Sequence, residues 1–323
     1  MTSLERVVVL AGGVGGARFA AGVVQVLPPE RVTVVVNVGD DFEHWGLWIS
    51  PDLDTVCYTL AGLENRTAGW GRRGESWRVL EEVRRLGGPD WFRLGDLDLA
   101  THLERTRRLR AGEPLSRIVA DFCRAWGVRA KVLPISDDRI PTLVETDEGT
   151  LAFQEYFVHR RWQPRVKGFR FQGAERARPA PGVMEALRQA DAVLFAPSNP
   201  WVSLDPILAL PGVREAVAAA PAVVGVSPII GGRAVKGPAA KMFREMGEEP
   251  SPMAVARHYR GLWQGMLIDA EDEGLEEAVA QALGGGLVWA RDTWMSTPEK
   301  RVAVARCALK LADAVRANAS HYF

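Results

Sequence analysis

The chain alternates between short, continuous apolar runs and segments with the helical spacing of apolar residues. A continuous apolar run predicts a strand buried on both faces, as in a parallel sheet, because a strand with one solvated face would alternate in polarity. Such strands are predicted at Arg6–Ala11, Val32–Asn37, Lys131–Pro134, Ala192–Ala196 and Ala222–Val226.

Amphipathic segments separate or precede these runs, and we predict helices at Ala17–Val26, Pro181–Gln189 and Val213–Ala219. Strands that alternate with helices are typical of a parallel sheet, since parallel neighbours need a crossover connection. The pattern therefore predicts the α/β class: a doubly wound, mostly parallel Rossmann-like sheet in a single domain spanning residues 1–323.

Two regions depart from this alternation. Residues 56–127 are mainly amphipathic helix with little strand signal, which predicts a helical insertion or cap on the sheet. Residues 142–172 alternate between apolar and polar positions, which predicts a β excursion resembling a hairpin. The tail, Pro298–Asn318, is predicted to be one long helix.

Composition narrows the class of protein. Of 323 residues, 47% are hydrophobic and 25% charged, and 40 basic residues balance 40 acidic ones, which gives no general attraction to nucleic acid or anionic lipid. The three cysteines form no CxxC pair, which disfavours zinc sites and a disulfide framework. Without a signal peptide or an uninterrupted membrane-length apolar stretch, we expect a cytoplasmic protein that binds neither membrane nor nucleic acid.

A glycine-rich turn follows the first predicted strand and contains Gly12, Gly13, Gly15 and Gly16. Glycines let a backbone approach phosphate oxygens, and the start of the following helix offers free N–H groups. Arg18 stands where the dinucleotide fingerprint has its third glycine, and the Lys-Ser/Thr ending of a P-loop is missing. A phosphate cradle and a simple tight turn both remain open.

Two acidic stretches come next along the chain. Asn37 closes the second predicted strand, where a dinucleotide-dependent dehydrogenase usually has an acid, and the pair Asp40 and Asp41 follows in the loop. In "SPDLDT", Asp52 and Asp54 would point the same way if the segment is extended. These carboxylates suit a hard divalent cation, whereas a solvated acidic turn and helix capping are the alternatives.

Two later loops, 196–208 and 225–241, follow buried strands and are rich in Gly and Pro. At the ends of parallel strands such loops line the ligand crevice, although ordinary loop punctuation is the alternative. Lysine adds a point charge suited to phosphate. The candidate phosphate-binding residues here are Ser198, Asn199, Ser227, Gly231, Gly232 and Lys236.

Taken together, these stretches resemble one known family. The motifs that carry the likeness are, in chain order, GGVGGARF, NVGDD, SPDLDT, RLGDLDLATH, PISDD, FQEYFV, APSNPWVSLDPIL and SPIIGGRAVKGPAAK. They resemble the 2-phospho-L-lactate transferase family (CofD in archaea, FbiA in actinobacteria) of coenzyme F-420 biosynthesis. The likeness covers most of the chain, and DTWMSTPEK is similar to the ending of the family.

The resemblance implies a magnesium-dependent transferase. Such an enzyme joins the deazaflavin Fo to a guanylylated three-carbon acid, whose donor is lactyl-2-diphospho-5′-guanosine or its enolpyruvyl counterpart. The ribityl hydroxyl of Fo takes the phospho-acid part, which gives (dehydro) coenzyme F-420-0, and GMP leaves. The likeness to the actinobacterial branch favours the enolpyruvyl donor, and the family implies a homodimer.

The resemblance also implies roles for single residues. Asp54 and Arg93 stand at positions that contact Fo, although other members have lysine in place of Arg93, and Asp54 could accept a proton. Asp40 and Asp54 lead as magnesium ligands, with Asp41 and Asp52 behind them. The glycine turn and the two later loops would bind the guanosine diphosphate part (GDP binding), while metal and positioning would carry most of the catalysis.

Two other functions compete with the transferase. A non-catalytic nucleotide-sugar-binding regulator of the gluconeogenesis-factor (YvcK-like) type shares the glycine turn and a nearby acidic loop. An NAD-dependent oxidoreductase is disfavoured by the missing third glycine and by Asn37 at the strand end. SPDLDT and GDLDLATH favour the transferase over the regulator.

Overall fold

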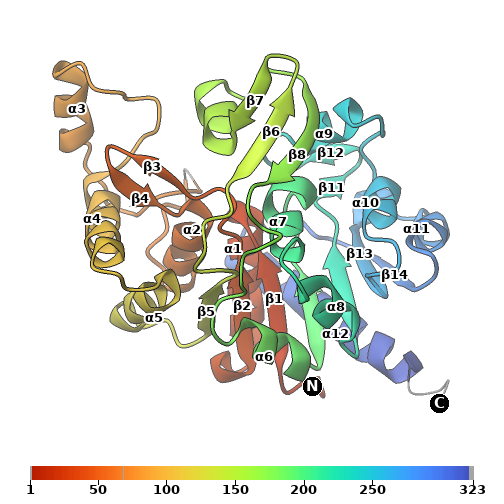
Figure 1. Cartoon of the computed structure of the whole chain (residues 1–323). Helices are drawn as coiled ribbons and strands as arrows, with labels where there is room; N and C mark the ends of the chain where they lie inside the picture. Colours follow the sequence, from red (N-terminus) through yellow and green to blue (C-terminus); the bar gives the residue numbers. More distant parts are fainter. Residues whose placement is uncertain (1, 68, 320–323) are drawn as a thin grey trace.

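A parallel sheet runs through the centre of the computed structural model, which describes residues 2–67 and 69–319 (Figure 1). Over these residues the sheet has seven strands in the order β14-β13-β10-β9-β1-β2-β5, and all neighbours are parallel. Its strands are β1 (Val7–Ala11), β2 (Val32–Val36), β5 (Lys131–Pro134), β9 (Ala192–Phe195), β10 (Val223–Val226), β13 (Gly265–Asp269) and β14 (Leu287–Arg291).

The continuous apolar runs correspond to the inner strands. Every residue of β1, β9 and β10 is buried, as a sheet covered on both faces requires. The five predicted strands are confirmed to within a residue at each end, but β13 and β14 were not predicted. β14 lies at the sheet edge and is partly exposed, while β13 runs from a glycine to an aspartate, so neither carries a long apolar run.

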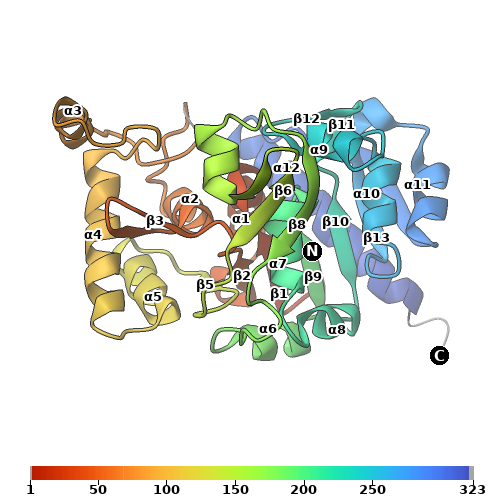
Figure 2. The ribbon, with the colours of Figure 1, turned by 45° about the horizontal axis from the view of Figure 1, so that its top comes forward.

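Helices cover both faces of the sheet, which confirms the doubly wound α/β prediction (Figures 1 and 2). On one face α1 packs against α12 and α2, whereas α6 and α8 pack together on the other. The helices are α1 (Gly13–Val26), α2 (Pro51–Leu60), α3 (Arg78–Arg85), α4 (Asp96–Arg110), α5 (Leu115–Ala125), α6 (Val183–Gln189), α7 (Asp205–Leu208), α8 (Val213–Ala218), α9 (Ala239–Glu245), α10 (Pro252–His258), α11 (Glu276–Leu283) and α12 (Pro298–Ala319).

The direction of winding reverses between β1 and β9. From β1 the chain winds outward through β2 to β5, and from β9 it winds the opposite way through β10 to β14. Crossovers that leave in opposite directions open a crevice at the carboxyl ends of the two central strands. The loops that begin at Gly12 and at Ala196 therefore border the expected ligand site.

Two excursions stand over this end of the sheet. Helices α3, α4 and α5 form the left-hand lobe in Figure 1, and β6, β7 and β8 form an antiparallel sheet above the centre. How they divide the chain into domains stays a prediction. The remaining elements are β3 (Phe42–His44), β4 (Leu47–Ile49), β6 (Thr142–Thr146), β7 (Gly149–Ala152), β8 (Val166–Phe171), β11 (Ile229–Ile230), β12 (Arg233–Ala234) and the short turns of helix Pro29–Arg31, Glu155–His159, Pro200–Leu204 and Ala270–Asp272.

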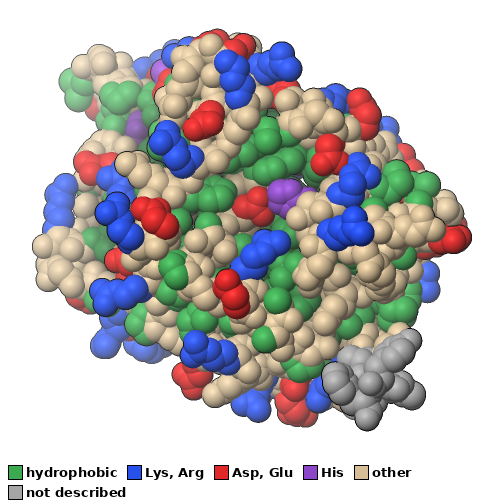
Figure 3. Space-filling view, turned by 45° about the vertical axis from the view of Figure 1, so that its right-hand side comes forward, with side chains coloured by type: hydrophobic (Ala, Val, Ile, Leu, Met, Phe, Trp, Pro, Cys, Tyr) green, Lys and Arg blue, Asp and Glu red, His purple; other side chains and the backbone are tan. Residues whose placement is uncertain are grey.

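The surface agrees with the balanced charge of the sequence. On the face seen in Figure 3, basic and acidic side chains alternate, with apolar side chains between them. Within residues 2–67 and 69–319, no helix combines the length and the apolar character needed to cross a membrane.

Candidate active site

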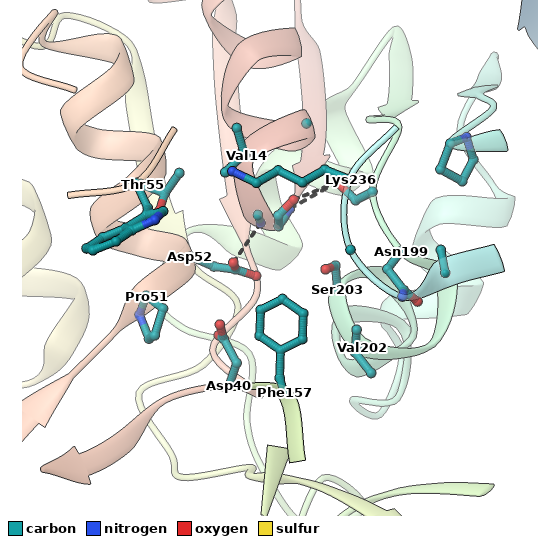
Figure 4. A pocket seen from close by; sticks show the side chains of 18 of the residues that line it. Val14, Asp40, Pro51, Asp52, Thr55, Phe157, Asn199, Val202, Ser203 and Lys236 are labelled. Atoms are coloured by element: carbon teal, nitrogen blue, oxygen red, sulfur yellow. Dashed lines mark hydrogen bonds between the residues drawn. The ribbon is translucent and has the colours of Figure 1, made fainter. Parts of the chain in front are cut away.

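A cavity of about 470 Å³ opens at the point where the winding reverses. Its walls come from the loops after β1, β2, β9, β10 and β14, from the start of α2 and from both excursions. Figure 4 shows Asp40, Asp52, Phe157, Ser203 and Lys236 around one common space. Segments far apart in the sequence thus meet where the strand order places a ligand crevice.

The glycines of the first turn let other parts of the protein approach. A Cβ at Gly12 would lie 2.5 Å from Asp52 Oδ2, and one at Gly15 would lie 2.6 Å from the carbonyl oxygen of Pro197. Gly13 has a φ of 64°, in the left-handed region that favours glycine. Helix α1 begins there, and the start predicted at Ala17 is four residues late because glycines, which are poor helix formers, make up most of the first turn.

Gly12, Gly13 and Gly15 line the cavity, whereas Gly16 does not. A Cβ at Gly16 would lie 2.9 Å from Ser198 Oγ, so this glycine serves packing under the turn. The first N–H groups of a helix have no acceptor within the helix. That of Gly13 donates to Asp52 Oδ1 at 2.6 Å. Phosphate binding by the turn stays a prediction.

The two acids of SPDLDT point to different places, so the extended conformation considered for them is wrong. Pro51 starts α2, and residues two apart in a helix lie on different sides. Asp52 lines the cavity, whereas Asp54 is not among its lining residues and pairs with Arg105 of α4. A proline fixes the φ suited to a first helical turn, and this signal could have located the helix start.

Asp40 and Asp52 converge on one amide group. Asn37 Nδ2 donates to Asp52 Oδ2 at 3.0 Å and lies 3.4 Å from Asp40 Oδ1. From the other side, Gln154 Nε2 approaches Asp40 Oδ2 at 3.4 Å. Burial raises the pKa of Asp52 to about 6, and it raises the pKa of Asp40 well above its ordinary value, with the neighbouring carboxylate of Asp52 adding to the effect.

Asp41 lies beside this pair but outside the cavity lining. Its Oδ2 accepts from Ser50 Oγ at 2.7 Å and from Trp48 Nε1 at 3.1 Å, while Oδ1 is buried and has no hydrogen-bond partner among the described residues. Burial raises the pKa of Asp41 to about 8. Its contacts hold the β3–β4 hairpin against the start of α2.

Asp54 belongs to a second, separate buried cluster. Arg105 Nη1 donates to Asp54 Oδ2 at 3.0 Å, and Arg105 Nη2 donates to Asp54 Oδ1. His102 Nδ1 lies 3.2 Å from Arg105 Nη1, and Tyr58 donates to Asp98 at 2.7 Å. Arg105 is 1% exposed, so one buried cation neutralises Asp54 and ties α2 to α4.

The polar side chains of the two later loops line the cavity but also hold their own loops. Ser198 Oγ donates to the Gly12 carbonyl oxygen at 2.7 Å, and Ser227 Oγ donates to that of Ile229 at 2.8 Å. Asn199 Oδ1 accepts from Trp201 N at 3.1 Å. Gly231 and Gly232 are not lining residues, and they form the turn between β11 and β12.

Three cationic side chains line the cavity: Arg93, Lys236 and Arg18. Lys236 is a predicted phosphate-binding residue, whereas the sequence interpretation treated Arg18 only as a misfit to a fingerprint. Burial lowers the pKa of Lys236, and the nearby charge of Arg18 adds to the effect. Arg18 lies one turn along α1 from Val14, a helical spacing that could have identified it.

Aromatic rings form one wall of the cavity, here called the aromatic wall: Trp70, Trp91, Phe92, Phe153 and Phe157. Arg93 also lines the cavity, and its guanidinium carbon lies 4.6 Å from the centre of the Trp77 ring. Phe157 stacks on Phe153, with ring centres 5.3 Å apart. Sequence patterns did not locate the wall, because its two halves come from different excursions. Lining residues that the sequence interpretation did not single out include Thr55, Phe92, Phe153, Gln154, Phe157, Val158, Thr293 and Met295.

Fold and site together define a class: an α/β protein with carboxylates, cations and aromatic rings around one cavity at its switch point. A family model described as 2-phospho-L-lactate transferase CofD matches residues 7–285. The chain belongs to this family of transferases, which confirms the resemblance drawn from its motifs.

Curated relatives support the family, and a solved structure supports the fold. The chain is 48% identical over 319 residues to the phosphoenolpyruvate transferase of Streptomyces griseus, covering 97% of this chain and 100% of the relative. It is 42% identical over 329 residues to that of Mycolicibacterium smegmatis, covering 95% and 98%. A crystal structure of a UPF0052 family member from Bacillus halodurans has a TM-score of 0.63 at 17% identity, covering 96% and 100%, and supports the fold.

Proposed function

We propose that this transferase uses the enolpyruvyl donor, enolpyruvyl-2-diphospho-5′-guanosine, and the deazaflavin Fo as acceptor. The names of its relatives support the donor, since two proteins that each match nearly the whole chain are phosphoenolpyruvate transferases. The ribityl hydroxyl oxygen of Fo bonds to the phosphorus that carries the enolpyruvyl group. The bond from that phosphorus to the bridging oxygen of the diphosphate breaks, GMP leaves with that oxygen, and the hydroxyl proton passes to solvent.

The guanosine diphosphate part would lie along the glycine turn. The first turn of α1 presents backbone N–H groups there, and Lys236 and Arg18 bring positive charge to the same cavity. The side chains of Ser198 and Ser227 fix the loops that shape this part. Backbone donors held in advance stabilise negative charge on the phosphate oxygens without reorganising.

The carboxylates fit a magnesium ion. Asp40 and Asp52 are buried, line the cavity together and share one amide donor, so two hard oxygen ligands face the place proposed for the diphosphate. Asp41 and Asp54 fit less well, because neither lines the cavity and Arg105 already neutralises Asp54. A bound magnesium ion would supply Lewis-acid stabilisation of the phosphoryl oxygens. Asp40 and Asp52 would anchor it, and Asn37 and Gln154 would orient them.

The aromatic wall suits the flat ring system of Fo. Offset stacking on rings such as Trp91 and Phe157 contributes attraction beyond the buried area, and Arg93 can donate to a ring oxygen. The position of Arg93 in the cavity lining supports the contact with Fo that was predicted for it. Asp54 lies outside the lining residues, so a direct contact with Fo or a proton-accepting role would need its pairing with Arg105 to change.

We also propose a cytoplasmic homodimer. The three free cysteines support an intracellular setting, where thiols stay reduced, and the dimer is what the resemblance to the family implies. Sedimentation of the purified protein would test the dimer. A mass of one chain, 35.4 kDa, over the working concentration range would overturn it.

The function is tested by GMP release. Purified protein, Fo and magnesium are offered the lactyl, enolpyruvyl and glyceryl donors in turn. Fo-dependent release of GMP, fastest with the enolpyruvyl donor, supports the proposal. Release fastest with another donor would correct the donor alone. No release with any donor, combined with tight binding of a nucleotide sugar, would favour the non-catalytic regulator.

A further inference from the structure

Asn37 occupies the centre of the site. It is the first residue after β2, its side chain is fully buried, and its backbone N–H donates to the Ala11 carbonyl oxygen at 3.1 Å. That bond ties the end of β2 to the end of β1. The Asn37 side chain therefore starts from a fixed point between the two strands whose ends border the cavity.

Its amide group joins three segments. Nδ2 donates to Asp52 Oδ2 at 3.0 Å and to the Val202 carbonyl oxygen at 3.1 Å, and it lies 3.4 Å from Asp40 Oδ1. Oδ1 accepts from Gly39 N at 2.7 Å. The start of α2, the loop after β2 and the loop after β9 thus converge on a single side chain.

Only one orientation of this amide satisfies its surroundings. If the group were rotated by half a turn, its oxygen would face three other oxygens and its amino group would face the N–H of Gly39. Among the described residues, neither Asp40 nor Asp52 forms a salt bridge, so neutral donors alone fix these carboxylates. Aspartate in place of Asn37 would keep the shape but offer no N–H.

We propose that Asn37 is a positioning residue that sets the separation of the Asp40 and Asp52 carboxylates and holds Asp52 beside the loop after β9. This inference rests on the proposed function, in which those two carboxylates anchor magnesium. Groups that orient metal ligands typically change metal affinity or activity by about 10–100-fold when removed. Asn37 acts through Asp40 and Asp52 rather than on substrate.

Two variants test this role. Asn37→Ala removes the amide, and Asn37→Asp keeps its outline without the donors. We measure Mn²⁺ affinity of Asn37→Ala by electron paramagnetic resonance, and kcat and KM for Fo of both variants by GMP release. The rate is referred to the number of GDP-binding sites, so that misfolded protein does not count. Asn318→Asp, on the exposed end of α12, adds the same charge far from the site and serves as control.

The expected result has a distinctive form. Mn²⁺ binding by Asn37→Ala weakens by about tenfold or more, and kcat of both variants falls by about tenfold or more, while KM for Fo stays within about threefold. Wild-type Mn²⁺ affinity and kcat in a folded Asn37→Ala protein would overturn the inference. Failure of the wild-type protein itself to bind Mn²⁺ and release GMP would instead overturn the proposed function.

Discussion

Two buried carboxylates on the first turn of α2, Asp52 and Asp54, belong to separate clusters and differ in their partners. Asp54 faces Arg105, a buried cation that balances its charge. Asp52 faces the amides of Asn37 and Gly13, which donate hydrogen bonds but carry no charge. The acids are only two positions apart, yet one is neutralised within the protein and the other keeps a charge that a ligand could balance.

The partner of a buried carboxylate distinguishes a structural acid from one that can bind a ligand. A carboxylate with a dedicated arginine is satisfied without a ligand, and its removal leaves an uncompensated buried charge. A buried carboxylate held only by neutral donors has a raised pKa, as Asp52 does at about 6, and gains most from a cation.

Breaking the paired cluster should cost the most stability. Arg105→Met leaves Asp54 buried without its cation, and we expect the free energy of unfolding to fall by about 3–5 kcal/mol. Urea denaturation measures it. The double variant Arg105→Met, Asp54→Leu should recover part of the loss, since no charge is then stranded. An Arg105→Met protein as stable as the wild type would erase the distinction between the clusters.

His44 is a buried basic side chain that, like Asp52, has no oppositely charged partner within residues 2–67 and 69–319. His44 Nε2 has no hydrogen-bond partner among the described residues, and burial lowers the pKa of His44 to about 4. The unfolded chain therefore binds more protons between about pH 4 and 6.5, so stability is complete above that range and falls by about 3 kcal/mol as pH drops through it. Chemical denaturation at pH 7 and at pH 4.5 tests this. His44→Phe should lose less stability on acidification than the exposed control His159→Gln.

Removing the charge of Asp52, which lines the cavity with Asp40, should lower activity rather than stability. Asp52→Asn keeps the shape but removes the charge, and we expect GMP release to slow by about a hundredfold, the order found when one preorganised electrostatic group is lost. Asp313→Asn, in α12, serves as a matched control. A rate within a factor of about three of wild type would show that Asp52 is structural, like Asp54.

The aromatic wall should respond most weakly. Phe157→Ala removes one ring beside the cavity and should raise KM for Fo by about tenfold with little change in kcat, since stacking contributes about 0.5–1.5 kcal/mol. Steady-state kinetics at saturating donor separate the two constants. An equal rise in KM for the guanylylated donor would place Phe157 beside the nucleotide instead.

Much of the fold could be predicted because buried parallel strands have a strong local signature. The runs of valine at β1 and β2 are typical of buried strands. In contrast, β14 lies at the sheet edge, is partly exposed and lacks that signature. The candidate site was harder. Local patterns indicated all four aspartates, Asp40, Asp41, Asp52 and Asp54, but they could not show that Arg105, far along the chain, neutralises Asp54.

The glycine turn shows the same limit in another form. Its sequence suggests room for phosphate, while the structure shows that Gly12 and Gly15 first make room for Asp52 and Pro197. Both uses need a residue without a side chain, so composition cannot distinguish them. The difference is visible only when segments distant in the sequence are placed together.

The packing of α1 against α12 has a consequence for the order in which the protein is completed during synthesis. A Cβ on Gly22 of α1 would collide with the carbonyl oxygen of Arg301 in α12, so the two helices touch backbone to backbone. Helix α1 leaves the ribosome before α12, and the strands from β2 to β14 are made between them. The helix whose first turn borders the cavity therefore waits for all of these strands before α12 can cover its outer face.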